Sequence, residues 1–373
     1  MPEPSRAVLR PYEDRDLEGT LRLRPLVYPG WREAGNVEWH VAVYDWLGRG
    51  PEAAAMHRWV LDRGGEIVGH LAAVPLPYRI GGRRVVAHTP TDYMALPGHG
   101  FQAVNLMRTF FRTCPNYVAC NVLGDASRIE GLFRPTAVAR LVHALKPLDV
   151  GRYPRLTRRL PRLATQLAAG VAGAGLRAVD AVLTAAARGG VAVTEEPPTA
   201  FDGRFDRLMD RVAVAVPCAV DRSAAFLAWR YGPGVPRGPM TLLTASVDGE
   251  LLGYAALRTT AQAEGFILDL TATPGRADVA RTLLAASIRR FWADRAFVAR
   301  YRFLPSPASP SRHDLARLGF VVRTEGRGLP GIGPERQLEL LVRFADPDAQ
   351  ATAVGPEHWS YNLGDGEASF WVH

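Results

Sequence analysis

The strongest constraint on the fold of this chain is a sequence pattern that occurs twice. Residues 65–70, GEIVGH, have the same turn-and-strand character as residues 249–254, GELLGY. Each copy is followed by a β-type run, a Pro-Gly pair (residues 97–98 and 274–275), an apolar helical pattern and another strand. We interpret the two copies as a diverged tandem duplication of one domain.

The first copy contains a Gly-His-Gly turn at residues 98–100, between a strand and a helix. Glycines remove Cβ atoms where a ligand must approach the backbone, and the free N–H groups of a helix N-terminus attract anions. The turn therefore predicts a pyrophosphate site, although a plain structural turn has the same pattern. Phe101, Val104, Met107 and Phe111 recur at helical spacing, so we expect them to form the buried face of the helix.

The order of the expected elements indicates an α+β protein with a mixed, mostly antiparallel sheet flanked by helices. Glycine pairs at residues 64–65 and 81–82 predict hairpins, and a strand at 117–122, a helix near 126–133 and a strand around 137–145 follow. The chain is then expected to divide into an N-terminal domain at 1–149, a helical connector at 150–204, a C-terminal domain at 205–346 and a tail at 347–373.

Charge and cysteine usage limit the classes of function. The net charge of +8 comes almost wholly from arginine, since Lys146 is the single lysine. A basic surface favours a phosphorylated cofactor, an acidic carrier protein or nucleic acid. Nucleic acid is disfavoured because the sequence has no aromatic-basic cluster or helix-turn-helix signal. Cys114, Cys120 and Cys218 lack metal-site or redox spacing, and they predict buried or incidental thiols in a reducing cytoplasm.

Neither the start of the chain nor the apolar run of the connector predicts a membrane protein. The start of the chain lacks the apolar segment of a secretory signal. The apolar run at residues 163–187 is interrupted by Arg177 and Asp180 and falls short of the roughly 20 apolar residues of a membrane span. We expect a surface-packed helix in a cytoplasmic protein; an amphipathic membrane helix is the alternative, and its apolar face would be mostly alanine.

These motifs resemble the GNAT acyltransferase superfamily in a tandem form. The matching parts are the hairpin at residues 65–69, the fourth strand at 92–97, the pyrophosphate loop at 98–100 and the later helix within 121–133. The resemblance implies that pantetheine lies between the diverging fourth and fifth strands, where a backbone N–H polarises the thioester carbonyl. An amine then attacks directly, so the protein supplies mainly proximity and proton transfer.

A narrower resemblance is to long GNAT proteins found near polysaccharide and natural-product genes. It rests on residues 205–234, with Asp221-Arg222 and Trp229-Arg230-Tyr231, and on the closing residues 358–371. The second copy departs from the family loop, because the sequence PGRADVARTLL lacks the second glycine. We therefore expect a structural second domain, although Arg276 and Arg281 could contact phosphate.

The resemblance places the site around the first loop. Asp92 and His99 are the candidates for removing the proton of the amine, because a carboxylate with a raised pKa or an imidazole can act near neutral pH. Ser127 is a candidate for protonating the leaving thiolate, and water or another side chain is the alternative. We expect cofactor contacts from Leu96, Gly98, His99, Gly100, Phe101 and Asn121. We expect substrate contacts from Tyr93 and Asp125.

Several of these residues have a structural alternative. Asp92 could be a strand-end residue with a backbone hydrogen bond, and His99 an exposed loop residue. Tyr93 suits a cleft wall or a core equally well. Helix capping accounts for Asp125 and Ser127. For Asp365, near the C-terminus, we expect only a turn.

Two functions follow from the sequence. The first is an N-acyltransferase that moves an acyl group to an amine from acetyl-CoA or a longer acyl-CoA, or from the phosphopantetheine of an acidic acyl carrier protein. The acceptor would be a small molecule, an amino sugar or a peptide held between the two copies, and no metal is expected. The second is a catalytically degenerate protein of the same fold that binds a peptide or a partner protein.

Overall fold

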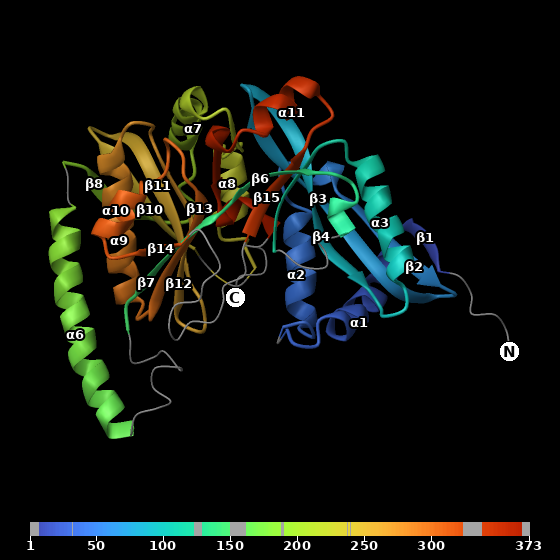
Figure 1. Cartoon of the computed structure of the whole chain (residues 1–373), viewed down its shortest axis with the longest axis horizontal. Coiled ribbons are helices and arrows are strands. Elements are labelled where there is room, and N and C mark those ends of the chain that lie inside the picture. The colour runs from blue at the N-terminus through green and yellow to red at the C-terminus, as the bar shows by residue number, and fades with distance from the viewer. Residues whose placement is uncertain are drawn as a thin grey trace.

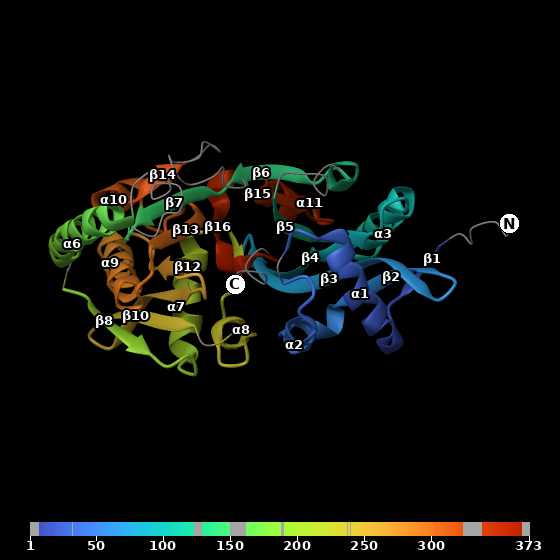
Figure 2. The same ribbon diagram turned by 90° about the horizontal axis from the view of Figure 1, so that it is seen from below.

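A computed structural model of the chain (Figure 1) describes residues 7–31, 33–122, 129–149, 162–187, 190–236, 238, 240–323 and 338–367. Two α+β halves lie side by side, each a sheet with helices on both faces (Figures 1 and 2). The expected fold class is therefore confirmed. Two short strands, β9 (Cys218–Val220) and β16 (Trp359–Asn362), join the sheets of the two halves into one.

The first half carries the glycine loop. Its sheet contains β1 (Val8–Pro11), β2 (His57–Arg63), β3 (Glu66–Ile80), β4 (Arg83–Ala95), β5 (Tyr117–Val122), β6 (Thr136–Arg140) and β15 (Leu338–Arg343). Helices α1 (Leu17–Val27) and α2 (Val37–Leu47) cover one face and α3 (Gly100–Thr113) covers the other, as Figure 2 shows. The expected hairpins are present, since Gly64, Gly65, Gly81 and Gly82 all adopt positive φ angles that suit glycine.

The second half repeats this order. Its sheet contains β7 (Val142–Pro147), β8 (Ala192–Glu196), β10 (Thr241–Val247), β11 (Glu250–Thr259), β12 (Glu264–Ala272), β13 (Val298–Leu304) and β14 (Val321–Arg323). Its helices are α6 (Arg162–Ala186), α7 (Gly203–Ala215), α8 (Ala224–Tyr231), α9 (Ala277–Ala293) and α10 (Arg312–Arg317); α11 (Pro347–Ala353) packs near the first sheet. The β10–β11 hairpin, β12, α9 and β13 thus correspond to the β2–β3 hairpin, β4, α3 and β5.

Strand pairing crosses the expected boundary between the domains. The run expected as one strand at residues 137–145 is two strands, of which β6 pairs in the first sheet and β7 pairs with β13 in the second. In return β15, expected in the second domain, lies between β5 and β6. Figure 2 shows β6 and β7 running from one half to the other. Each half therefore completes its sheet with a strand from the other part of the sequence.

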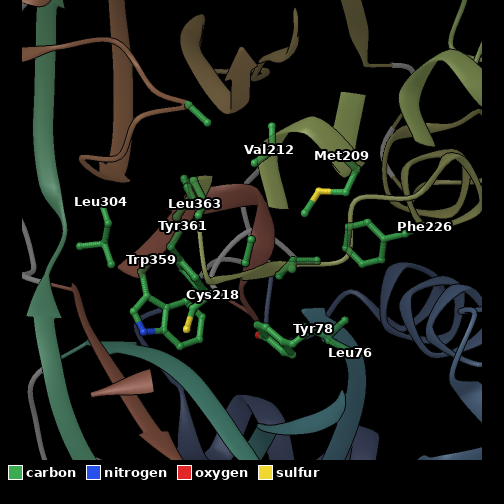
Figure 3. Close-up of a cluster of buried hydrophobic side chains, with 14 of the residues drawn as sticks. Leu76, Tyr78, Met209, Val212, Cys218, Phe226, Leu304, Trp359, Tyr361 and Leu363 are labelled. Atoms are coloured by element: carbon green, nitrogen blue, oxygen red, sulfur yellow. The ribbon is translucent and has the colours of Figure 1, made fainter. Parts of the chain in front are cut away.

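A central hydrophobic cluster joins the two halves (Figure 3). It includes Tyr78 of β3, Val212 of α7 and Trp359 of β16, all at most 1% exposed. Side chains alternate across a strand, so neighbouring residues of β11 face different cores: Tyr254 belongs to the central cluster, whereas Ala255 packs in the cluster that includes α9. Shared apolar burial of this kind makes independent unfolding of either half unfavourable.

The connector helix α6 packs against α9 on the outside of the second half (Figure 1). Its attachment uses the single lysine: Lys146 Nζ lies 2.7 Å from Asp180 Oδ1, and Trp292 Nε1 donates to Asp180 Oδ2 at 2.8 Å. Lys146 and Asp180 are both buried. Among the described residues, no helix combines the length and the apolar character needed to cross a bilayer.

Candidate functional site

The glycine loop forms an open helix N-terminus at the end of β4. Gly98 has a φ of +91°, and His99 precedes the first residue of α3, Gly100. A Cβ atom at either glycine would meet no heavy atom within 4 Å, so the backbone is accessible from that side. Ala103 N donates to His99 O at 3.0 Å, which leaves the earlier N–H groups of α3 outside its hydrogen-bond ladder. This arrangement suits an anion.

A cation from a neighbouring strand lies beside the loop. Arg63 of β2 places Nη1 3.3 Å from His99 Nε2 and also pairs with Glu66. The loop sequence itself, Gly98-His99-Gly100, contains no arginine. Arg63 supplies positive charge at this point from β2, and sequence reasoning missed it because the contact depends on how the strand and the loop are arranged in space.

The parallel strands β4 and β5 diverge before they reach the loop. Their only register pair is His88 with Tyr117, and His88 N donates to Asn116 O at 2.9 Å. No described strand pairs with residues 89–95 of β4 on the β5 side. The register between β3 and β4 also shifts at Asp92, whose φ of +54° is unusual for a residue other than glycine. A bulge at this position bends the strand away from its neighbour.

The carboxylate of Asp92 points to the helices rather than to the loop. Arg24 of α1 pairs with Oδ1, and the Tyr44 hydroxyl donates to Oδ2 at 2.8 Å. Asp92 and Arg24 are both buried. Burial, together with the negative charge of Asp92, raises the pKa of Tyr44 well above its ordinary value, which keeps this hydroxyl protonated as a donor. Asp92 is therefore neither a strand-end residue with a backbone bond nor a carboxylate open to solvent.

Two buried histidines support the same bulge. His70 Nδ1 lies 3.2 Å from the carbonyl oxygen of Asp92, and His40 Nε2 accepts from Arg24 Nε at 2.9 Å. Burial, and then the charge of Arg58, lower the pKa of His70 to about 3. Burial, and then the charge of Arg24, lower the pKa of His40 to about 4. Both imidazoles are thus neutral at pH 7 and act as hydrogen-bonding groups.

The other predicted site residues are only partly gathered at the loop. Tyr93 and Leu96 pack against the apolar cluster under α3, and Tyr93 O accepts from Tyr28 at 2.9 Å. Asn121 lies on β5, paired in register with Glu339 of β15. Asp125 and Ser127 lie outside the described residues.

The prediction for the face of α3 was wrong at Phe101. Its side chain is 93% exposed, whereas Ala103, Leu106, Met107 and Phe110 are buried. The apolar spacing includes Phe101 in the buried face, but in the structure that face begins at Ala103. Phe101 consequently presents an aromatic ring to solvent directly beside the glycine loop.

A groove lies between the two halves. It has a volume of about 550 Å³ and runs between α2 and the β11–β12 turn. The lining includes Glu33, Glu38 and Trp39 from the first half and Arg258 and Thr260 from the second. Trp39 tilts against His40, whose Nε2 contacts Arg24, so the groove wall is connected to the support of Asp92.

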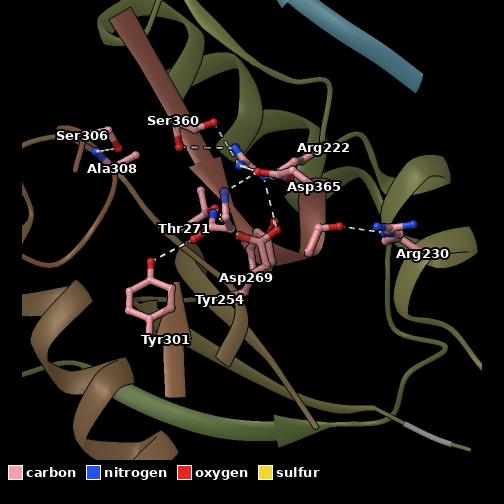
Figure 4. A network of polar contacts seen from close by, with 12 residues as sticks. Arg222, Arg230, Tyr254, Asp269, Thr271, Tyr301, Ser306, Ala308, Ser360 and Asp365 are labelled. Carbon is pink, nitrogen blue, oxygen red and sulfur yellow. Dashed lines mark hydrogen bonds and ion pairs between the residues drawn. The ribbon is translucent and has the colours of Figure 1, made fainter. Parts of the chain in front are cut away.

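The second half contains a buried polar network that sequence reasoning missed (Figure 4). Arg222 Nε lies 3.1 Å from Asp365 Oδ1 and 3.3 Å from Asp269 Oδ2, and all three residues are at most 1% exposed. The expectation of a simple turn at Asp365 was therefore wrong. Burial raises the pKa of Asp365, opposed by Arg222. One signal for Asp269 was present: it lies five residues before Pro274, as Asp92 lies five residues before Pro97.

Solved structures share this architecture. A GCN5-related N-acetyltransferase from Anabaena variabilis superposes with a TM-score of 0.56 and 12% identity, over 91% of this chain and 73% of that one. The chain has the GNAT fold. A second GNAT protein, from Kribbella flavida, gives 0.55 and 13% over 93% and 74%. Saccharomyces cerevisiae N-myristoyltransferase with bound myristoyl-CoA gives 0.54 and 12% over 92% and 81%. No protein-family model and no curated protein sequence matches the chain.

Proposed function

We propose that the protein is an N-acyltransferase that uses acyl-CoA bound in the first half. The observation that supports this most strongly is the divergence of β4 and β5 directly before an open glycine loop at the N-terminus of α3. A pyrophosphate would bind the free N–H groups of α3 beside Arg63. The exposed ring of Phe101 offers a stacking surface for an adenine.

The slot between β4 and β5 suits an extended ligand with amide groups. Residues 89–95 have strand conformation without a described strand partner on the β5 side, and an amide-bearing arm can satisfy such backbone groups as an added strand does. A thioester held there would lie along the strand that the Asp92 bulge bends. A backbone N–H of this strand would polarise the carbonyl as the amine forms its bond to carbon and the thiolate leaves.

The acceptor amine would enter from the groove between the halves. Two carboxylates, Glu33 and Glu38, and the Trp39 indole line its α2 side, which suits a cationic amine with an apolar part. Among the proton acceptors predicted from sequence, His99 lies at the loop with Nε2 beside Arg63, and both Asp92 oxygens are engaged by Arg24 and Tyr44. An amino sugar, an amino acid derivative or a peptide amine all fit this description. The thermal-shift titration described next also compares acyl chains of different length and compares CoA with carrier protein as the donor.

The first experiment is a thermal-shift titration with acetyl-CoA and longer acyl-CoAs. A ligand at 100 times its dissociation constant adds about 2.7 kcal/mol to the stability of the state that binds it. We expect Gly100→Glu to abolish the shift, because a carboxylate would occupy the place of the pyrophosphate. The substitution itself should be tolerated, since Gly100 is exposed and acidic residues are favourable in the first helical turn.

The matched control is Ala277→Glu. Ala277 is the first residue of α9 and is also exposed, so the same charge is added to the corresponding helix of the second half. We expect this variant to bind acyl-CoA like the unchanged protein. Equal loss of binding in both variants, or loss in Ala277→Glu alone, would contradict a site in the first half.

The second candidate function is non-catalytic binding of a peptide or partner protein by the same fold. The groove between the halves is the feature that favours it, because the described lining residues could contact a peptide whether or not a cofactor is bound. Absence of a thermal shift with every acyl-CoA and with acylated carrier protein would support this alternative over the acyltransferase.

A further inference from the structure

We propose that the C-terminal segment, residues 359–366, fills in the second half the slot that acyl-CoA uses in the first, so that each chain has one acyl-CoA site. The inference rests on the function proposed above for the first half. Each half has a slot between two diverging parallel strands, β4 and β5 in the first half and β12 and β13 in the second. We infer that the two slots have different occupants.

The strands of the second half diverge as those of the first half do. The parallel strands β12 and β13 pair only over Glu264–Ile267 with Val298–Tyr301. Beyond this point β16 takes the free edge of β13, with Asn362 opposite Phe303 and Tyr361 opposite Leu304. The short helix η5 (Leu363–Asp365) then lies against β12. The chain thus satisfies the separated strand edges with its own backbone.

Polar contacts fix the C-terminal segment between these strands. Asn362 Nδ2 donates to Asp269 Oδ1 at 2.9 Å, and Tyr301 donates its hydroxyl to Asn362 Oδ1 at 2.8 Å. Arg222 pairs with Asp365, as Figure 4 shows, and donates from Nη2 to Ser360 O at 3.2 Å. These side chains are at most 3% exposed, so the segment is built into the interior rather than laid on the surface.

The close fit of the C-terminal segment leaves no space for an acyl-CoA arm between β12 and β13. A Cβ atom at Gly364 would lie 2.7 Å from Leu268 O and 2.0 Å from the Tyr231 hydroxyl. Arg230 binds the carbonyl oxygens on either side of Asp365, at 2.7 Å for Gly364 and 2.8 Å for Gly366. An arm that entered between β12 and β13 would first have to remove these contacts.

The first half has no corresponding occupant among its described residues. Beyond the His88–Tyr117 pair, no described strand lies between β4 and β5. The neighbouring loop keeps both glycines, whereas Arg276 in the second loop is paired with Asp278 at 2.7 Å. Arg63 beside the first loop is likewise paired, with Glu66, so the two loops differ in the glycine that begins α3, whose counterpart at the start of α9 is Ala277.

Hydrogen exchange on the whole protein tests the proposal directly. Without ligand, we expect the amides of residues 359–366 to exchange as slowly as those of the β11–β12 core. On addition of acetyl-CoA or myristoyl-CoA, we expect new protection at residues 96–104, none at 273–281, and one bound acyl-CoA per chain by equilibrium dialysis. Fast exchange over 359–366, protection at 273–281, or two acyl-CoA molecules per chain would overturn the proposal.

An engineered disulfide tests whether residues 359–366 stay in the slot or leave it when acyl-CoA binds. Leu304 and Tyr361 are register partners, a separation that suits a bond between cysteines. Oxidised Leu304→Cys/Tyr361→Cys protein should bind acyl-CoA like its reduced form, because the segment never has to leave. Loss of binding only on oxidation would show that the segment moves, against the proposal. If no acyl-CoA binds even the unchanged protein, the proposed function fails, whereas the exchange rate of residues 359–366 still decides whether the slot is filled.

Discussion

The two halves place an aspartate at the same point of the fold but surround it differently. Asp92 on β4 and Asp269 on β12 both lie five residues before a Pro-Gly turn, and near each the register with the hairpin partner shifts. The partners of Asp92 come from α1 and α2. Those of Asp269 come from the strands themselves, from Arg222 and from the C-terminal segment.

This difference bears on what the aspartate does. In the second half the aspartate is fully buried and accepts a hydrogen bond from the C-terminal segment that we propose fills the slot. Bending the strand therefore accounts for an aspartate in both halves. In the first half the helices supply the partners, and no described strand pairs with residues 89–95 of β4 on the β5 side. The following predictions break or sharpen this comparison, beginning with the largest effect.

We expect the two halves to be inseparable as polypeptides. Residues 1–149 lack β15, which lies between β5 and β6 and has fully buried Leu340 and Val342. Expressed alone, this fragment should stay unfolded by amide chemical-shift dispersion. Co-expression with residues 150–373 is the control and should restore a folded complex. A dispersed spectrum from residues 1–149 alone would show that the strand exchange is dispensable.

Replacing the buried arginine of the second half should lower the stability of the protein more than replacing the buried arginine of the first half. Arg222→Met leaves Asp269 and Asp365 without their shared cation, and breaking such a pair costs about 3–5 kcal/mol. Arg24→Met leaves one carboxylate, Asp92, which keeps the Tyr44 hydroxyl, so its cost should be smaller. Urea unfolding of the two variants measures the difference. An equal or larger loss in Arg24→Met would contradict this ranking.

The sequence predicted the parts of the fold that depend on local patterns. Hairpin glycines, the Pro-Gly turns and the apolar face of α9 follow from spacing over a few residues, and the structure has them in the expected order. The strand exchange was not predicted, because β6 and β7 form one apolar run whose division at Leu141 depends on which sheet each part joins.

Within the site, the loop was predictable and its surroundings were not. Gly98 and Gly100 form a local sequence pattern that predicts the turn. Arg63 and Arg24 lie far from their partners His99 and Asp92 in the sequence, so no local pattern predicts these contacts. The role of Asp365 was missed for the same reason, since its partner Arg222 lies 143 residues earlier in the chain. Long-range ion pairs leave no periodicity, so a single sequence gives them no pattern to detect.

Acid should destabilise the protein through the histidines of the first half. His70 accepts a proton only near pH 3 when folded but near pH 6.5 when unfolded, so the unfolded state binds more protons between these values. The contribution of neutral His70 to the free energy of unfolding is therefore fully present above pH 6.5. It decreases as the pH is lowered, by up to about 2 kcal/mol at pH 5. His70→Asn, which can keep the bond to Asp92 O, should flatten this dependence in urea unfolding at pH 7 and pH 5. An unchanged slope would exclude His70 as its source.

The smallest effect, and the one that decides between the two roles of Asp92, is expected for Asp92→Asn. An amide can still accept from Arg24 or Tyr44, so we expect a loss of about 1–2 kcal/mol in stability, since bonds to the neutral group are weaker. If Asp92 only bends β4, kcat with acyl-CoA and a responsive amine should fall less than tenfold, and the pH–rate profile should keep its shape. If Asp92 removes the proton, kcat should fall at least a hundredfold, and the acidic limb of the profile should move. Asp269→Asn is the matched control, because any loss of rate in that variant must come from the scaffold and sets the size of a purely structural effect.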